Sequence, residues 1–146
     1  MALSNIFDIA GSGMSAESVR LNTVASNLAN ADSVSSSPES SYKARYPVFQ
    51  AVQDSLAAGG NGTGPTAAAD ASVMVRGIVQ TTTPGTASYD PGNPLADANG
   101  YVYSSNVNVV EQMADMISAS RSYQNDADVL NTSKQLMLDT LKLGQS

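Results

Sequence analysis

The sequence predicts a protein that is mainly α with a small β insert, in which long N- and C-terminal helices pair as a coiled coil. At both ends of the 146-residue chain, apolar residues recur at alternating intervals of four and three, the spacing of a coiled-coil seam. Between these ends the period is lost and Gly, Pro and Ser become frequent. The expected division is therefore a coiled-coil helix at 1–32, a segment of short strands and loops at 33–105, and a second coiled-coil helix at 106–146.

The N-terminal helix has one seam of mainly apolar positions. All of them except Glu17 are apolar: Leu3, Phe7, Ala10, Met14, Glu17, Leu21, Val24, Leu28 and Ala31. Gly11 and Gly13 lie off this seam, and each costs about 1 kcal/mol relative to Ala inside a helix. We therefore expect this helix to depend on partners for its stability.

The stretch from Leu21 to Asp32, LNTVASNLANAD, carries three asparagines inside a helical pattern. Asparagine is a poor helix former because its side chain competes for backbone hydrogen bonds. Short amides do, however, let neighbouring helices approach closely and bond to one another. We therefore predict polar contacts between subunits at Asn22, Asn27, Asn30 and, on the second helix, Arg121. The alternative is an isolated two-helix hairpin with a weakly polar surface.

The middle segment predicts a few strands joined by turns. Residues 42–52 alternate like a strand, although Pro47 confines that strand to an edge or an end. Residues 73–83 predict a half-buried strand with Val73, Val75, Gly77 and Val79 on one face. The sequence DPGNPLADANG at 90–100 is a series of turns before a short strand, YVY, and residues 59–65 are a flexible loop by composition.

The C-terminal helix is expected to begin after Asn108, because Asn followed three residues later by Glu111 is typical of a capping box. Its seam positions are Val109, Met113, Met116, Ser120, Tyr123, Ala127, Leu130, Lys134, Met137 and Leu141. A flanking set at Val110, Ile117 and Leu138 gives a second apolar edge, and Gly144 suits the position after the helix. From both helices we predict these subunit-packing residues: Leu3, Phe7, Met14, Leu21, Val24, Leu28, Val109, Met113, Met116, Ile117, Tyr123, Leu130, Met137 and Leu141.

The composition argues against an enzyme. The chain has neither His nor Cys, so a Ser–His–Asp triad, a thiolate nucleophile and a His- or Cys-ligated zinc site are all excluded. A net charge of −6 with only scattered Lys and Arg argues against binding of nucleic acid. The sequence also shows no apolar run long enough to span a membrane and no cleavable signal pattern. We expect no catalytic residues, no cofactor and no metal.

Two motifs imitate binding sites. GSGMSA at 11–16 fits a dinucleotide-binding fingerprint, but a helical pattern follows where that fold requires a second strand, so two glycines within a helix are the better interpretation. DPGNPLADANG offers oxygen ligands, but the twelfth residue counted from Asp97 is Asn108, where a calcium-binding EF-hand needs Glu. Turn chemistry explains this segment better.

Three motifs, in order along the chain, carry a family resemblance. LNTVASNLANAD, YDPGNPLADANGYVY and NVNVVEQMADMISASRSYQNDADVLNTSKQLMLDTLKLG resemble the bacterial flagellar axial proteins, and among them the C-type subunits of the proximal rod of the basal body. Asn93, Leu95 and the YQND at 123–126 depart from the family pattern, and residues 33–64 match it least.

The resemblance implies a structural subunit of the flagellar rod, the periplasm-spanning drive shaft that transmits torque for motility and encloses the export channel. The implied route is type III export without a cleaved signal peptide, followed by self-assembly in the periplasm. The implied partners are other copies of the chain, other rod proteins, the ring–rod adaptor and the export apparatus. A cytosolic helical-hairpin chaperone or adaptor of a secretion system is the alternative, although such a protein has no need of the β insert.

Overall fold

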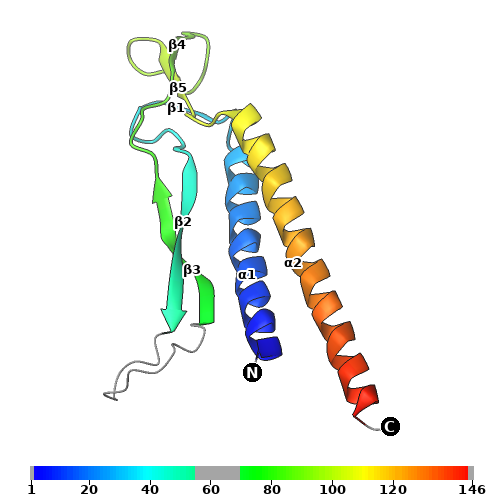
Figure 1. The fold of residues 1–146 in the computed structure, drawn as a ribbon. Helices are drawn as coiled ribbons and strands as arrows, with labels where there is room; N and C mark the ends of the chain where they lie inside the picture. The colour runs from blue at the N-terminus through cyan, green and yellow to red at the C-terminus, as the bar shows by residue number, and fades with distance from the viewer. Residues whose placement is uncertain (1, 55–69, 145–146) are drawn as a thin grey trace, which may run out of the picture.

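The computed structural model describes residues 2–54 and 70–144, and two long helices dominate it. Helix α1 (Ala2–Ala29) and helix α2 (Val109–Leu143) lie side by side and antiparallel, so both chain ends lie at the same end of the molecule (Figure 1). Helix α2 has 35 residues against 28 for α1 and continues past the start of α1. The prediction of two long terminal helices around a β segment is confirmed.

The strands form two separate antiparallel sheets. Strands β2 (Arg45–Asp54) and β3 (Asp70–Gln80) make a hairpin. Strands β1 (Val34–Ser35), β4 (Ala87–Tyr89) and β5 (Tyr101–Ser104) make a small sheet in the order β1-β5-β4. The strands expected at 42–52, 73–83 and 101–103 correspond to β2, β3 and β5. The predicted loop at 59–65 lies outside the described residues.

A bulge interrupts the hairpin. Val48 is paired with Gly77, but the next residue, Phe49, is paired with Val75, so Arg76 on β3 has no partner in the ladder. An extra residue in one strand reverses the side to which the following residues point. The prediction that Val73, Val75, Gly77 and Val79 share one face is therefore wrong, because the first two lie on one side of the hairpin and the last two on the other.

Helix α1 lies between the hairpin and α2, and it contacts both (Figure 1). Its buried residues are small or polar apart from one valine: Ala10, Ala16, Thr23, Val24 and Asn27. On α2 the buried residues are Gln112, Ala119 and Ser133. The two helices therefore meet along a seam of small and polar side chains. Within the described residues, neither helix holds a stretch apolar enough to cross a membrane.

Gly13 lies directly against the side chain of Asp126 on α2. A Cβ atom built at Gly13 would lie 2.7 Å from Oδ2 of Asp126 on α2, whereas one at Gly11 would meet nothing within 4 Å. Both glycines lie inside α1, as expected from their interpretation as helical residues. A side chain at position 13 would push the carboxylate of Asp126 away, so glycine leaves room for that carboxylate beside α1.

The two glycines provide a matched pair of variants. Replacing Gly11 by Ala should stabilise α1 by about 1 kcal/mol, because the methyl group meets open space and Ala favours the helix. Replacing Gly13 by Ala should stabilise the protein less, because the side chain of Asp126 must move. Far-UV circular dichroism of the purified chain, as helix content and thermal midpoint, measures both effects. Equal gains would mean that Asp126 moves aside at no cost.

Candidate functional site

Asn27 joins three elements through one buried amide. Its Nδ2 atom donates to Oε1 of Gln112 on α2 and to the backbone oxygen of Arg45 at the start of β2, each at 2.8 Å. Its Oδ1 atom accepts from the Tyr42 hydroxyl and from the Arg45 backbone N–H, each at 3.0 Å. The side chain is 0% exposed, and all of these bonds lie within the chain. Asn27 thus fixes α1, α2 and the hairpin relative to one another.

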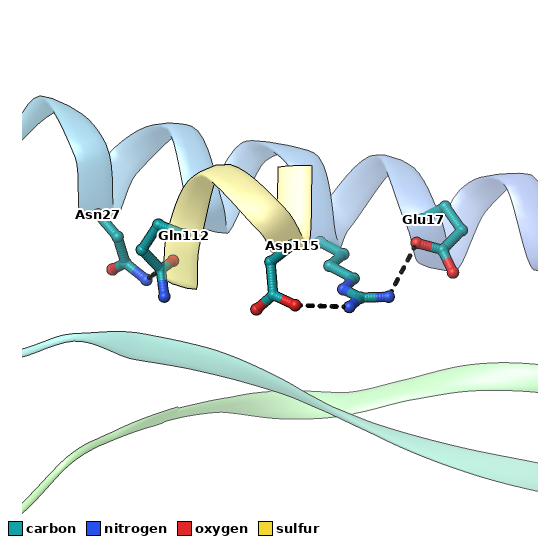
Figure 2. A network of polar contacts seen from close by, with 5 residues as sticks. Glu17, Asn27, Gln112 and Asp115 are labelled. Carbon is teal, nitrogen blue, oxygen red and sulfur yellow. Dashed lines mark hydrogen bonds and ion pairs between the residues drawn. The ribbon is translucent and has the colours of Figure 1, made fainter. Parts of the chain in front are cut away.

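Gln112 forms the α2 side of this joint and is also 0% exposed. Figure 2 shows its side chain opposite Asn27, on the edge of the helix pair that faces the hairpin. Burial raises the pKa of Tyr46 on β2, the carboxylates of Glu111 and Asp115 raise it further, and the Gln112 amide lowers it. The first turns of α2 therefore reach the hairpin directly.

An ion-pair network continues the joint along the helices. Arg20 Nη2 lies 2.9 Å from Asp115 Oδ1 on α2, and Arg20 Nη1 lies 3.7 Å from Glu17 Oε2, one turn earlier on α1 (Figure 2). Glu17, the one charged residue of the predicted α1 seam, therefore lies within ion-pair distance of Arg20. All three side chains are partly exposed to solvent, so the network contributes less to stability than to the register between the helices.

Asn106 is a second side chain whose amide links separate segments of the chain, and the sequence pattern did not predict it. Its Oδ1 atom accepts from the backbone N–H of Ala44 at 2.7 Å. Its Nδ2 atom donates at 2.6 Å to Thr81 Oγ1 and to the backbone oxygen of Thr83. These bonds attach the base of the hairpin to the chain that leads into α2. The only sequence signal for Asn106 was its place two residues before the helix cap, Asn108. The cap itself is as predicted: Asn108 Oδ1 accepts from the backbone N–H of Val110 at 3.1 Å, which confirms the start of α2.

Asp97 organises the turn before β5. Its Oδ1 atom accepts from the backbone N–H groups of Asn99 and Tyr101 at 2.8 and 2.9 Å, and the Tyr103 hydroxyl donates to Oδ2 at 3.3 Å. These bonds, led by the one from Tyr101, lower the pKa of Asp97. The turn interpretation of this segment is confirmed. The described residues contain no cluster of three or more acidic side chains placed to hold a metal ion.

The predicted subunit-packing residues are mostly left uncovered by the chain itself. Of these, Val24 is buried, while Phe7, Met14, Leu21, Leu28, Met116, Leu130 and Met137 are half-buried. Val109, Met113, Ile117, Tyr123 and Leu141 are exposed, and the side chain of Leu3 lies outside those that the structure describes. Large apolar side chains thus flank the seam between the helices instead of filling it, because small residues occupy the line of contact.

The predicted polar contacts divide into two groups. Asn22 and Arg121 are exposed, as a contact with another molecule requires. Asn30 donates to the backbone oxygen of Ser26 at 2.8 Å within its own helix. Asn27 differs from the expectation, because its amide is enclosed and fully bonded inside the chain. We therefore assign Asn27 to the tertiary structure and not to a contact between subunits.

Comparisons with known proteins identify similarity along the whole chain. Residues 7–35 match the family model described as "Flagella basal body rod protein", and residues 98–143 match "Flagellar basal body rod FlgEFG protein C-terminal". The chain is 52% identical over 145 residues to the flagellar basal-body rod protein FlgC of Salmonella typhimurium and 51% identical over 146 residues to that of Yersinia enterocolitica. The FlgC protein of Buchnera aphidicola subsp. Acyrthosiphon pisum is 39% identical over 149 residues. Each alignment covers 99% of this chain and 100% of the relative.

Removing the Asn27 amide should be costly. Replacing Asn27 by Ala leaves the Gln112 side chain and the backbone of Arg45 without their partners, and an orphaned buried polar group costs roughly 1–3 kcal/mol. We expect a loss of about 3 kcal/mol in the free energy of unfolding, measured by urea denaturation. The control is Asn22→Ala, an exposed amide on the same helix, which should change stability by at most about 0.5 kcal/mol. Similar losses in both variants would contradict the role of Asn27 as the joint.

Two substitutions at Asp97 test the role of its carboxylate in the turn. Asp97→Asn keeps an oxygen that can accept from Asn99 and Tyr101, whereas Asp97→Ala removes it. We therefore expect faster hydrogen exchange at these two backbone amides in the Ala variant and little change in the Asn variant. Nuclear magnetic resonance exchange measurements on the purified chain resolve the two positions. Equal protection in both variants would show that the prolines hold this turn without Asp97.

Proposed function

This chain belongs to the FlgC family of flagellar basal-body rod proteins, and from that premise we propose how its helices build the rod. It is a structural subunit of the rod, not an enzyme. The helical segments 1–32 and 106–146 form a coiled-coil layer around the export channel, and 33–105 forms an outer part. In this arrangement the rod transmits torque across the periplasm. The alternative of a cytosolic chaperone gains no support from the relatives, whose printed names describe rod proteins.

The observation that carries this proposal is an apolar flank of the helix pair that the chain leaves uncovered. On α1, Arg20 and Asn27 contact α2, and the apolar Leu21 and Leu28 each follow one of them by one residue. One residue is about 100° around a helix. Val19 and Ser26, which precede Arg20 and Asn27 by one residue, line the depression toward the hairpin. Leu21 and Leu28 therefore lie on the side of α1 away from the hairpin.

Helix α2 adds to the same flank. Glu111 precedes the buried Gln112, and its carboxylate raises the pKa of Tyr46 in the hairpin. Glu111 therefore marks the side of α2 nearest the hairpin. Val109 and Met113 lie about 60° and 100° from Gln112 in the opposite sense around the helix. Because Asn27 bonds Gln112, these residues are level with Leu28 on α1. Together they present large apolar side chains that helices of neighbouring subunits would cover.

The partners follow from this architecture. Neighbouring helices in a closed tube come from other copies of the chain and from other rod proteins, with the ring–rod adaptor at the inner end. We propose that the chain passes the type III export apparatus unfolded and without a cleaved signal peptide, and that it assembles in the periplasm. The polar and small seam between α1 and α2 favours such a route, because a helix pair with a modest apolar contact is easily unfolded and refolded.

A charge on this flank at Leu28, or at the predicted packing residue Leu130 of α2, should block assembly without blocking export. A buried Leu contributes roughly 1.5–3 kcal/mol, and an unpaired carboxylate in a dry interface adds a further cost. We therefore expect Leu28→Asp and Leu130→Asp subunits to be exported but absent from isolated basal bodies, leaving cells without hooks or filaments. Immunoblots of periplasmic and basal-body fractions, with electron microscopy of cells, measure this.

The controls are Leu28→Met and Leu130→Met, which keep apolar volume and should assemble normally. Normal rods in the two Asp variants would remove the assignment of this flank to subunit packing. A subunit that stays in the cytosol in both Asp variants would point instead to a defect before export.

A further inference from the structure

The turn before β5 contains an asparagine followed by a glycine, Asn99–Gly100. Asparagine is one of the chemically labile residues of proteins, and it deamidates fastest before glycine, which has no side chain to hinder the attack of its own backbone nitrogen. The chain has one other such pair, Asn61–Gly62, which lies outside the described residues. Asn99 is exposed, so water can reach its side chain. Position 99 therefore has the chemistry of a modification site.

Deamidation of Asn99 needs only water as a co-reactant. The backbone nitrogen of Gly100 loses its proton and attacks Cγ of Asn99, the Cγ–Nδ2 bond breaks, and ammonia leaves. Water then opens the resulting cyclic imide at either carbonyl, which gives aspartate or isoaspartate at position 99. No atom is oxidised or reduced. The reaction therefore depends on whether the Gly100 nitrogen is free and can approach Asn99 Cγ.

The fold requires glycine after Asn99. Gly100 has a φ of +82°, in the left-handed region that favours glycine. A Cβ atom at this position would also lie 2.9 Å from Cε2 of Tyr89 and 3.3 Å from Cβ of Pro91. Tyr89 in turn packs edge-on against Tyr101, with ring centroids 5.3 Å apart. The turn thus keeps glycine for a structural reason, and any protection of Asn99 comes from its conformation.

Hydrogen bonds hold both sides of the Asn99–Gly100 peptide. The Gly100 N–H donates to the backbone oxygen of Asp97 at 3.0 Å, and the Gly100 oxygen accepts from the Asp90 N–H at 2.9 Å. The N–H groups of Asn99 and Tyr101 donate to Asp97 Oδ1 at 2.8 and 2.9 Å. The nitrogen that would attack is therefore already engaged, and its peptide rotates toward Asn99 Cγ only if these bonds break.

Asp97 restrains the Asn99 side chain as well. The pKa of Asp97 is lowered first by the backbone bond from Tyr101, and hydrogen bonds from both the backbone and the side chain of Asn99 lower it further. The side-chain contact restricts the rotation that would bring Asn99 Cγ to the Gly100 nitrogen. One carboxylate therefore restrains both the backbone of the turn and the amide that would react.

We propose that Asn99 is a deamidation site that the folded turn protects, with Asp97 as the protecting residue. The reaction then follows the population of the open turn and not the exposure of Asn99. An isoaspartate product would add one backbone atom between the two N–H groups that Asp97 binds, those of Asn99 and Tyr101. Strand β5 begins at Tyr101, so this atom would disturb its pairing with β4. The chemistry is independent of assembly into a rod, so the purified chain suffices for a test.

Peptide mapping by mass spectrometry measures the protection. The purified chain is incubated in neutral buffer with and without guanidinium chloride, and asparagine, aspartate and isoaspartate at position 99 are quantified over time. We expect Asn99 to react about tenfold or more slowly in the folded chain, because the hydrogen bonds of the turn must break first. In denaturant, Asn99 and Asn61 should react at similar rates, as two unfolded Asn–Gly pairs. A much slower Asn99 in denaturant, or equal rates at Asn99 with and without it, would overturn the proposal.

A pair of variants separates the acceptor oxygen of Asp97 from its charge. Asp97→Ala removes Oδ1 and should raise the rate at Asn99 in the folded chain about tenfold, toward that of the denatured chain. Asp97→Asn keeps an acceptor oxygen and should react at nearly the rate of the parent. No acceleration in the Ala variant, or equal acceleration in both, would contradict the role given to this oxygen.

Far-UV circular dichroism shows whether the effect of Asp97→Ala is local. The helix signal should match that of the parent, because the contacts of Asp97 lie within the turn and β5. Faster deamidation together with loss of the helix signal would mean that the variant unfolds as a whole, which contradicts a protecting role confined to this turn.

Discussion

The amide of Asn27 is the interaction on which the arrangement of this molecule depends. It bonds α2 through Gln112 and the hairpin through the backbone of Arg45, and it is itself part of α1. The two helices bury few large apolar side chains, since their buried residues are mostly small or polar. A satisfied buried amide is specific in direction as well as in partner, so it determines where the three elements meet. The ion pairs of Arg20 extend the same alignment by two turns along α1.

The sequence predicted the elements well and the line of contact between the helices poorly. The four-and-three spacing located both helices, and Asn108 located the start of α2. The same spacing chose Leu21 and Leu28 as the seam, but these lie one residue beyond the positions that contact α2. Periodicity finds the large apolar side chains, and in a subunit with several neighbours these need not face the chain's own second helix. Small residues such as Ala16 and Gly13 carry no strong hydrophobic signal, although Ala16 is buried and Gly13 leaves room for the Asp126 side chain of α2.

The polar residues show a related limit. The asparagines of LNTVASNLANAD indicated that this helix has close neighbours, yet the sequence could not separate Asn27, which serves the tertiary structure, from the exposed Asn22. The distinction depends on Tyr42, Arg45 and Gln112, which are distant in sequence or lie outside any helical pattern. In the middle segment, β1 and β4 were missed because two or three residues have no period, and both exist only through pairing with β5. The bulge at Arg76 had one sequence signal, the isolated Gly77 next to it, which the alternation of Val73, Val75 and Val79 concealed.

The unequal lengths of the two helices give the molecule a direction. Asn27 and Gln112 are level, so the start of α1 at Ala2 is level with about position 137 of α2. The last six helical residues of α2 therefore project by about 9 Å beyond α1, with Leu141 and Leu143 exposed on them. One end of the subunit is the projecting C-terminal end of α2, and the other end carries the small sheet of β1, β4 and β5 (Figure 1). Any stack of such subunits in one orientation has unlike ends, so the two ends present different surfaces to the next subunit that arrives.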